Sequence, residues 1–238
     1  MKALTFIAIT LLSGAIAGTI LALVNQGVVE PFIEQAIEIE NHQAAAKGEI
    51  INPTELAAFR LWQKGGSIAA GTVLGLSLGA LFGLVFAYGR KMLPGSTNLK
   101  KALVLAAVMW AVLYLVPAIK YPANPPAVGD PGTIYLRMSL YVAILMISGV
   151  SALGLAIISR KVTMNRFIEP AAYAGIIAVA FVALPANPDA ITAPMDLVNS
   201  FRIASGATMT MFWTLLGAIL GAFWDRTKPH ETARVKTK

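Results

Sequence analysis

Apolar residues gather along this chain in long uninterrupted runs. Four runs of 22 residues contain no charged side chain: Ala3–Val24, Ser67–Tyr88, Met138–Ser159 and Ile203–Trp224. Two shorter runs, Ala102–Ile119 and Pro170–Leu184, each end in a proline-rich stretch. A helix needs about 20 apolar residues to cross a hydrocarbon core of ~30 Å. The pattern therefore predicts an all-α, polytopic membrane protein with six transmembrane helices.

Composition agrees with lipid as the solvent. The 238 residues are 57% hydrophobic and 13% charged, whereas a soluble domain carries about 25% charged residues. We therefore treat residues 1–238 as a single integral membrane domain. The first run is too long for a signal peptide and no polar cleavage region follows it, so we expect it to be retained as a helix.

Charge is divided unequally between the two sides that six crossings define. One side receives 13 basic and three acidic residues, net +10, and the other receives six basic and nine acidic residues, net −3. The basic side includes the loops 89–101 and 159–169, which contains Arg166, and the basic tail 227–238. Because Lys and Arg concentrate on the cytoplasmic side, both termini are expected in the cytoplasm, with the protein in the cell (inner) membrane. The overall charge of +7 then requires no nucleic-acid partner.

Residues 25–66 form the one sizeable extracytoplasmic connection. Within it, apolar residues recur at helical spacing at Val29, Phe32, Ile33, Ala36 and Ile37. Acidic residues and a histidine follow every four positions on another face: Glu30, Glu34, Glu38 and His42. This pattern is typical of an amphipathic helix, which lies either on the outer membrane surface or across the helix ends.

The chain also repeats itself. The motif Pro-Ala-Asn-Pro-Pro-Ala at 122–127 returns as Pro-Ala-Asn-Pro-Asp-Ala at 185–190, each time after a short span. A helix-start signal and then an arginine follow each copy: Asp130 precedes Arg137, and Asp196 precedes Arg202.

A weaker version of the pattern leads from Asn52 to Arg60. We therefore predict three helical hairpins of parallel orientation, with 102–160 and 170–226 as the clearest copies, related by an axis along the membrane normal.

Small residues line several predicted spans. Glycines fall on one helix face at every fourth position: Gly14 and Gly18, then Gly71, Gly75, Gly79 and Gly83, and finally Gly217 and Gly221. Such faces let helix backbones approach closely, and they indicate assembly rather than a substrate.

Candidate translocation residues sit in the repeated loops. A 15-residue span such as Pro170–Leu184 covers only ~22 Å, so the loops that follow the short spans are expected to dip into the membrane. Asn124 and Asn187 would then offer oxygens to a solute. The alternative is that both loops are proline-stiffened surface turns.

Charged residues beside these loops complete the candidate set: Asp130, Arg137, Asp189, Asp196 and Arg202. The arginines either pair with Asp130 and Asp196, bind an anion, or reach the headgroups from the membrane edge. No span carries an ionisable residue at its centre, which disfavours a carboxylate proton relay.

Glu34, Glu38 and His42 are the candidate metal ligands. Donors eight residues apart on a helix are separated by ~12 Å, so at most two neighbours can hold one ion; the alternative is a solvated acidic face. The chain has no cysteine, which excludes thiolate sites and disulfides. No catalytic or nucleotide motif is present, so neither an enzyme nor a covalently bound cofactor is expected.

The stretch Tyr-Pro-Ala-Asn-Pro-Pro-Ala-Val-Gly-Asp-Pro at 121–131 resembles the CbtA family of predicted cobalt transporter subunits. The likeness extends to Pro31, to 184–202 and to the 212–217 run. The resemblance implies an inner-membrane protein associated with cobalt uptake for cobalamin, and a small partner, CbtB, with one membrane helix and a histidine-rich end. Many members carry histidines near the ends of the third and fifth spans, and this chain has none there.

Taken with the residues, the resemblance leads us to expect a transport subunit for Co²⁺ or another divalent cation as substrate. The lipid bilayer and a CbtB-type subunit are the expected partners, and a homo-oligomer stays open. A non-transporting membrane scaffold and a small-solute channel are the alternatives.

Overall fold

The computed structural model describes residues 2–48, 50, 52–126, 128–161, 167–189, 191 and 193–230. The chain there is all-α. Its elements are α1 (Ala3–Val28), α2 (Glu30–Ala46), α3 (Pro53–Gly89), α4 (Asn98–Trp110), the π-helical segment η1 (Ala111–Leu115), α5 (Val116–Lys120), the short 3₁₀ turn η2 (Pro131–Thr133), α6 (Ile134–Ser159), α7 (Ile168–Ala183) and α8 (Met195–Thr227). Arg166 and residues 231–238 of the predicted basic tail lie outside the described residues.

Within this described part, five helical segments are long and apolar enough to cross a membrane: Ala3–Val28, Pro53–Gly89, Asn98–Lys120, Pro131–Ser159 and Met195–Thr227. They confirm a multi-pass membrane protein and five of the six predicted spans. The remaining one, α7, is apolar but has only 16 residues, about 24 Å of helix. Large apolar side chains stay exposed along the helices, such as Val182 at 89%, as expected for surfaces that face lipid.

Several helix starts follow the predicted capping chemistry. The Asn52 side chain accepts hydrogen bonds from the backbone amides of Thr54 and Glu55 at the start of α3. Asp130 accepts from the Gly132 amide at 2.7 Å where η2 leads into α6. Such caps satisfy amides that have no partner within the helix, so the local sequence determines where α3 and α6 begin.

The glycine faces bring α1 and α3 into backbone contact. A Cβ placed on Gly75 would lie 2.6 Å from the Cα of Gly18, closer than real side chains approach. The same holds between α8 and α4, where a Cβ on Gly221 would lie 2.6 Å from the Cα of Leu99. The prediction that these glycines serve close packing is confirmed.

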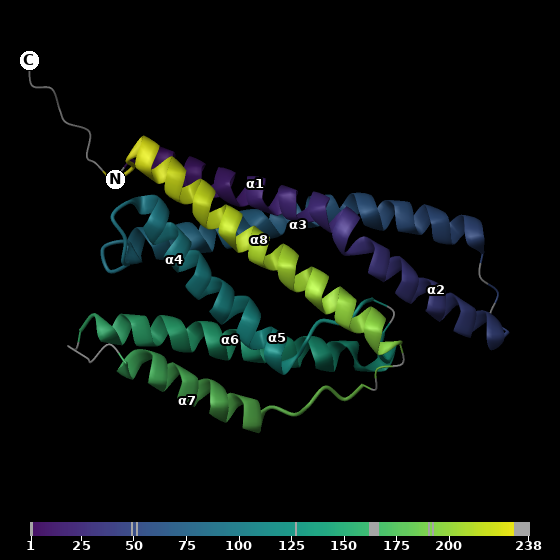
Figure 1. Ribbon diagram of the computed structural model, residues 1–238. Helices are drawn as coiled ribbons and strands as arrows, with labels where there is room; N and C mark the ends of the chain where they lie inside the picture. Colours follow the sequence, from purple (N-terminus) through teal and green to yellow (C-terminus); the bar gives the residue numbers. More distant parts are fainter. Residues whose placement is uncertain are drawn as a thin grey trace, which may run out of the picture.

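Helices α1, α3, α4, α6, α7 and α8 alternate in direction along the chain (Figure 1). α8 packs against α1 and α4, and α7 packs against α6. Aromatic side chains fill the core between α3, α4 and α8: Phe82, Phe86, Phe212, Trp213 and Trp224. The packing therefore does not show the predicted equivalence of the hairpins. α7 and α8 were expected to pair with each other, but α8 packs mainly on α4 and α1, and α7 packs on α6.

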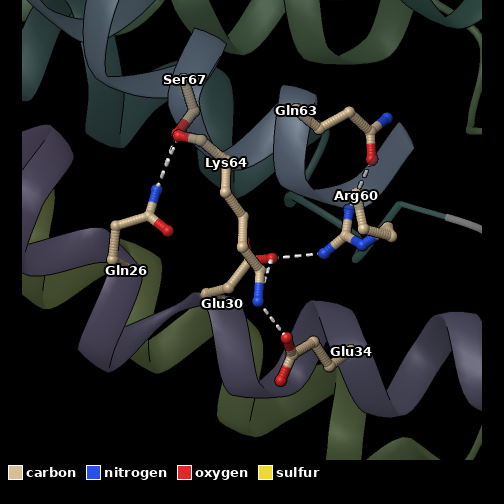
Figure 2. A network of polar contacts seen from close by, with 7 residues as sticks. All are labelled: Gln26, Glu30, Glu34, Arg60, Gln63, Lys64 and Ser67. Carbon is tan, nitrogen blue, oxygen red and sulfur yellow. Dashed lines mark hydrogen bonds and ion pairs between the residues drawn. The ribbon is translucent and has the colours of Figure 1, made fainter. Parts of the chain in front are cut away.

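α2 packs against the start of α8 and is paired with the first part of α3. Its Ala36 packs with Leu197 and Val198 of α8 and with Val128 of the 121–131 loop. On the opposite face, Glu30 pairs with Arg60, and Glu34 pairs with Lys64, both from the first turns of α3 (Figure 2). Apolar packing and ion pairs thus hold α2 between α8 and α3.

The start of α1 and the end of α8 lie together. The backbone amide of Lys2 donates a 2.8 Å hydrogen bond to the Pro229 carbonyl, and the rings of Phe6 and Trp224 meet edge to face with centroids 5.9 Å apart. Both described ends of the chain therefore lie at the same end of the molecule, opposite α2 (Figure 1).

Candidate functional site

The two repeated loops meet at the α2 end of the molecule, and Lys120 holds one of them. Its Nζ donates to the carbonyls of Phe181 and Leu184 at 2.7 and 2.8 Å. The Tyr121 hydroxyl donates to the Pro185 carbonyl at 2.6 Å. The last carbonyls of a helix lack partners within the helix. The Lys120 ammonium group at the end of α5 therefore caps the carbonyl end of the short helix α7.

Arg137 binds both loops at once. Its guanidinium lies 3.0 Å from the carboxylate of Asp189 and donates to the Asp130 carbonyl at 3.1 Å. The Asp189 carboxylate is 5% exposed and also accepts from Thr133 at 2.7 Å. The prediction offered the Asp130 carboxylate as partner; that carboxylate instead caps Gly132. Asp189 of the other repeat takes its place.

Arg202, which follows the second repeated loop, binds the first one. From α8 it donates to the Ala123 carbonyl at 3.0 Å and to the Asn124 side-chain oxygen at 2.8 Å. The predicted partner, Asp196, lies exposed in the first turn of α8, where a carboxylate favours the positive helix end. Each arginine of the two clear repeats therefore fastens the loop of the other.

Both candidate asparagines use their side-chain oxygens within the loops. Asn124 accepts from Arg202, and Asn187 accepts from the Asp189 amide at 3.2 Å. Such a bond to the amide two residues on is the usual turn chemistry of asparagine. The two side chains therefore stabilise the conformation of the two loops.

A pocket of about 540 Å³ opens between these loops and α2. Asn124, Asn187 and Arg137 line it, together with Tyr141 of α6 and Glu40 of α2. Three of the sequence-predicted residues therefore converge on one cavity, although they are up to 63 positions apart. Asp130, Asp189, Asp196 and Arg202 are not among its lining residues.

Glu40 is the charged lining residue that sequence reasoning missed. It falls outside the four-residue spacing of Glu30, Glu34 and Glu38, and only the packing of α2 against α8 and the 121–131 loop brings it to the pocket. Since Asp189 offsets the charge of Arg137, the exposed Glu40 carboxylate is the remaining charged group among the lining residues.

A second hollow of about 320 Å³ contains the predicted metal ligands Glu34, Glu38 and His42, together with Arg60. Glu34 is engaged by Lys64, and that hydrogen bond lowers the pKa of its carboxyl, supported by the charges of Lys64 and Arg60. Lys64 and Arg60 thus make Glu34 the least available of the three as a ligand.

Glu38 and His42 remain as a pair, with Oε1 and Nε2 3.9 Å apart and both side chains exposed. Two donors on a tetrahedral ion with bonds of 2.0–2.2 Å are about 3.4 Å apart, so the pair could share an ion after a small rotation of these exposed side chains. Across the described part of the chain, no group of three His, Asp or Glu side chains is placed to hold a metal.

The helical architecture and the loops that carry the site lie within residues 3–225, which match a family model described as "Probable cobalt transporter subunit (CbtA)". No curated protein and no solved structure matches the chain. Membership of a transporter family points to a non-enzymatic transport subunit, with cobalt as its substrate and further transporter subunits as its partners. The chain belongs to the CbtA family, the family of probable cobalt transporter subunits.

Proposed function

We propose that this chain provides the membrane passage for a divalent cation, Co²⁺ in the first place, with the 540 Å³ pocket as its outer vestibule. One observation carries the proposal: Asn124 and Asn187, from two copies of the same motif, line one cavity with an acidic residue of α2. Matching loops after short spans are where transporters of repeated architecture place their substrate sites.

The electrostatics favour a cation. Arg137 is paired with Asp189, so its charge is offset close to the pocket, and Glu40 supplies a carboxylate at the rim. Backbone carbonyls and asparagine side chains supply neutral polar groups. The Glu40 carboxylate would attract a hydrated divalent ion, and Arg202, bonded to the lining residues Ala123 and Asn124, would weaken the attraction. The ion would then be retained weakly, as conduction requires.

Glu38 and His42 form the proposed capture point. They lie two residues either side of Glu40 on α2, about half a helical turn from it, and imidazole with carboxylate suits borderline divalent metals. Two exposed donors bind weakly, which fits an ion that has to be passed on.

The topology belongs to the same proposal. α7 would complete six crossings, with Lys120 satisfying its carbonyls where the helix is too short to reach the far surface. Both termini would be cytoplasmic, 25–66 extracytoplasmic and 227–238 a cytoplasmic tail, in the inner membrane. The shared end of α1 and α8 and the alternating helix directions (Figure 1) support an even number of crossings. The hairpins 102–160 and 170–226 would then be parallel copies.

A small one-helix, histidine-rich subunit of the CbtB type is the proposed partner in metal delivery. Uptake of radiolabelled cobalt into vesicles that contain this chain, with and without that subunit, tests the transport role. Glu40→Gln should reduce uptake, whereas Asp196→Asn, which removes an exposed carboxylate outside the pocket, should not. Full uptake by Asn124→Ala combined with Asn187→Ala would contradict the vestibule; absence of any uptake would favour a scaffold or a small-solute channel.

Labelling tests the topology independently. A reagent that cannot cross the membrane should modify a cysteine placed at residue 47 from outside and one placed at residue 236 only after permeabilisation. Equal labelling of both positions in intact cells contradicts the six-crossing arrangement.

A further inference from the structure

The third long span contains a π-helical segment at Ala111–Leu115. A π segment inserts one extra residue into a helix, alters its hydrogen bonding and is frequent at functional sites. Here it separates the 13-residue α4 from the five-residue α5. The backbone of this span is therefore irregular well below its outer end.

A chain of oxygens connects this segment with two other helices. The Ser148 hydroxyl of α6 donates to the Val112 carbonyl at 2.5 Å and lies 2.6 Å from the Tyr173 hydroxyl of α7. Ser148 is fully buried. It lies about 21 Å along α6 from Ile134, so the three oxygens are near the middle of this span, where polar groups are costly.

The same face of α6 leads from the pocket to this point. Arg137 and Tyr141 line the pocket, Ile144 follows with no exposed surface, and Ser148 comes one turn later. Residues at these spacings lie on one helix face, so Ser148 is about 10 Å beyond Tyr141. Ile144 is the apolar side chain between the two polar regions.

We propose that the cation path leaves the pocket along this face of α6 and passes the oxygens of Val112, Ser148 and Tyr173, with Ile144 closing the way between them. This inference rests on the proposed function and extends the cation path from the pocket toward the middle of the membrane. Oxygen ligands suit a divalent cation, and an apolar constriction closes a path by excluding water. Neutral oxygens also hold an ion without the deep trap that a carboxylate would create.

The distances indicate what opening requires. Neighbouring ligands of an octahedral ion with bonds of about 2.1 Å are separated by about 3.0 Å. The two oxygen–oxygen distances here are 2.5 and 2.6 Å. An ion can bind between them only after η1, α6 and α7 have moved apart slightly, so the present arrangement is closed.

Matched substitutions on α6 and α7 test the path against a purely structural role. Ser148→Ala and Tyr173→Phe should each lower cobalt uptake by the assembled transporter about tenfold. The controls are Ser139→Ala, which removes an exposed hydroxyl bonded within α6, and Tyr135→Phe, which alters a 76% exposed side chain; both should retain full uptake. Thermal unfolding identifies any variant that merely fails to fold.

A cysteine scan gives an independent readout, because the chain has no cysteine of its own. In the full transporter, Ser148→Cys should react with a small cationic thiosulfonate added from outside, and Cd²⁺ should slow the reaction. Ile144→Ala should accelerate it. Val150→Cys, which is 61% exposed on the same helix where only lipid would reach it, should react slowly.

Equal labelling at residues 148 and 150, together with full uptake by Ser148→Ala and Tyr173→Phe, overturns the path. A wild-type transporter that moves no cobalt overturns the proposed function instead; the labelling pattern then still decides whether water reaches Ser148.

Discussion

The guanidinium of Arg202 donates a 2.8 Å hydrogen bond to the side-chain oxygen of Asn124, a residue 78 positions earlier in the chain. Arg137 makes the reciprocal contact with Asp189. The arginine that follows each repeated loop therefore binds the opposite loop. The two copies of the motif support each other, and the pocket between them depends on both.

Loss of Arg202 should loosen the 121–131 loop. Arg202→Ala removes two hydrogen bonds, and bonds that involve a charged group contribute about 1.5–3 kcal/mol when buried, less at this partly exposed site. We expect a lower melting temperature and faster proteolysis in the loop. Arg202→Lys should recover little, because lysine lacks the planar fork that reaches both acceptors. A loop equally resistant in all three proteins would contradict this role.

The Arg137–Asp189 pair should show strong coupling. Arg137→Ala leaves a nearly buried carboxylate without its charged partner, a change that costs about 3–5 kcal/mol for a fully buried pair. Asp189→Asn should cost less, since Thr133 can still bond to the amide. Thermal unfolding of both single variants and of the double variant gives the coupling free energy. Strictly additive losses would show that the pair is not an energetic unit.

Close packing of α1 on α3 predicts a large difference between two glycines. Gly75→Ala should separate the helices, because its Cβ would lie 2.6 Å from the Cα of Gly18. Gly154→Ala, with no atom within 4 Å of the new Cβ, should be neutral or stabilising, because alanine favours a helix by about 1 kcal/mol over glycine. Melting temperatures in detergent measure both; similar values for the two variants would contradict the packing.

Acid should weaken the attachment of α2 to α3. The hydrogen bond from Lys64 holds the pKa of Glu34 below its ordinary value of 4.5. The contribution of the pair is therefore complete above the unfolded-state pKa and is lost as pH falls through the lower, folded-state pKa. The effect is small, because half of the Glu34 side chain is exposed and water screens such an ion pair.

Hydrogen exchange of the α2 amides, compared at each pH between wild type and Glu34→Gln, measures this contribution. The two proteins should differ above pH 4.5 and converge in more acidic solution. A constant difference throughout the range would mean that the pair does not hold α2.

Lys120 should be needed for the end of α7. Lys120→Met leaves the carbonyls of Phe181 and Leu184 without their donor, which should cost about 2 kcal/mol or more. The matched control, Lys91→Met, alters an exposed lysine and should be neutral. Melting temperature and the accessibility of a cysteine at residue 185 report the change; identical behaviour of both variants would rule out the capping role.

The positions of the long helices could be predicted because hydrophobicity is a local property of each segment. The caps at Asn52 and Asp130 were also predictable, since capping acts over three residues. The partners of Arg137, Arg202 and Lys120 were not, because each lies more than 50 positions away. Local spacing favoured Asp130 for Arg137, and only the meeting of the two loops makes Asp189 the nearer carboxylate.

The pocket was predictable in part. Repetition of the motif singled out Asn124 and Asn187, and both line the cavity. Glu40 was missed because its relevance depends on the orientation of α2, which follows from apolar packing against α8. The π segment was missed for a similar reason: nothing in Ala-Val-Leu-Tyr-Leu distinguishes it from an ordinary apolar helix, and contacts from α6 accompany it.

The dependence of α1 and α4 on α8 has a consequence for biogenesis. Membrane proteins are synthesised from the amino terminus, so both earlier helices enter the bilayer before their shared neighbour exists. The faces of α1 and α4 that pack on α8 then contact lipid until Met195–Thr227 leaves the ribosome. A nascent chain that stops before this helix would present unmatched surfaces to chaperones and quality-control proteases, so maturation of the protein depends on α8.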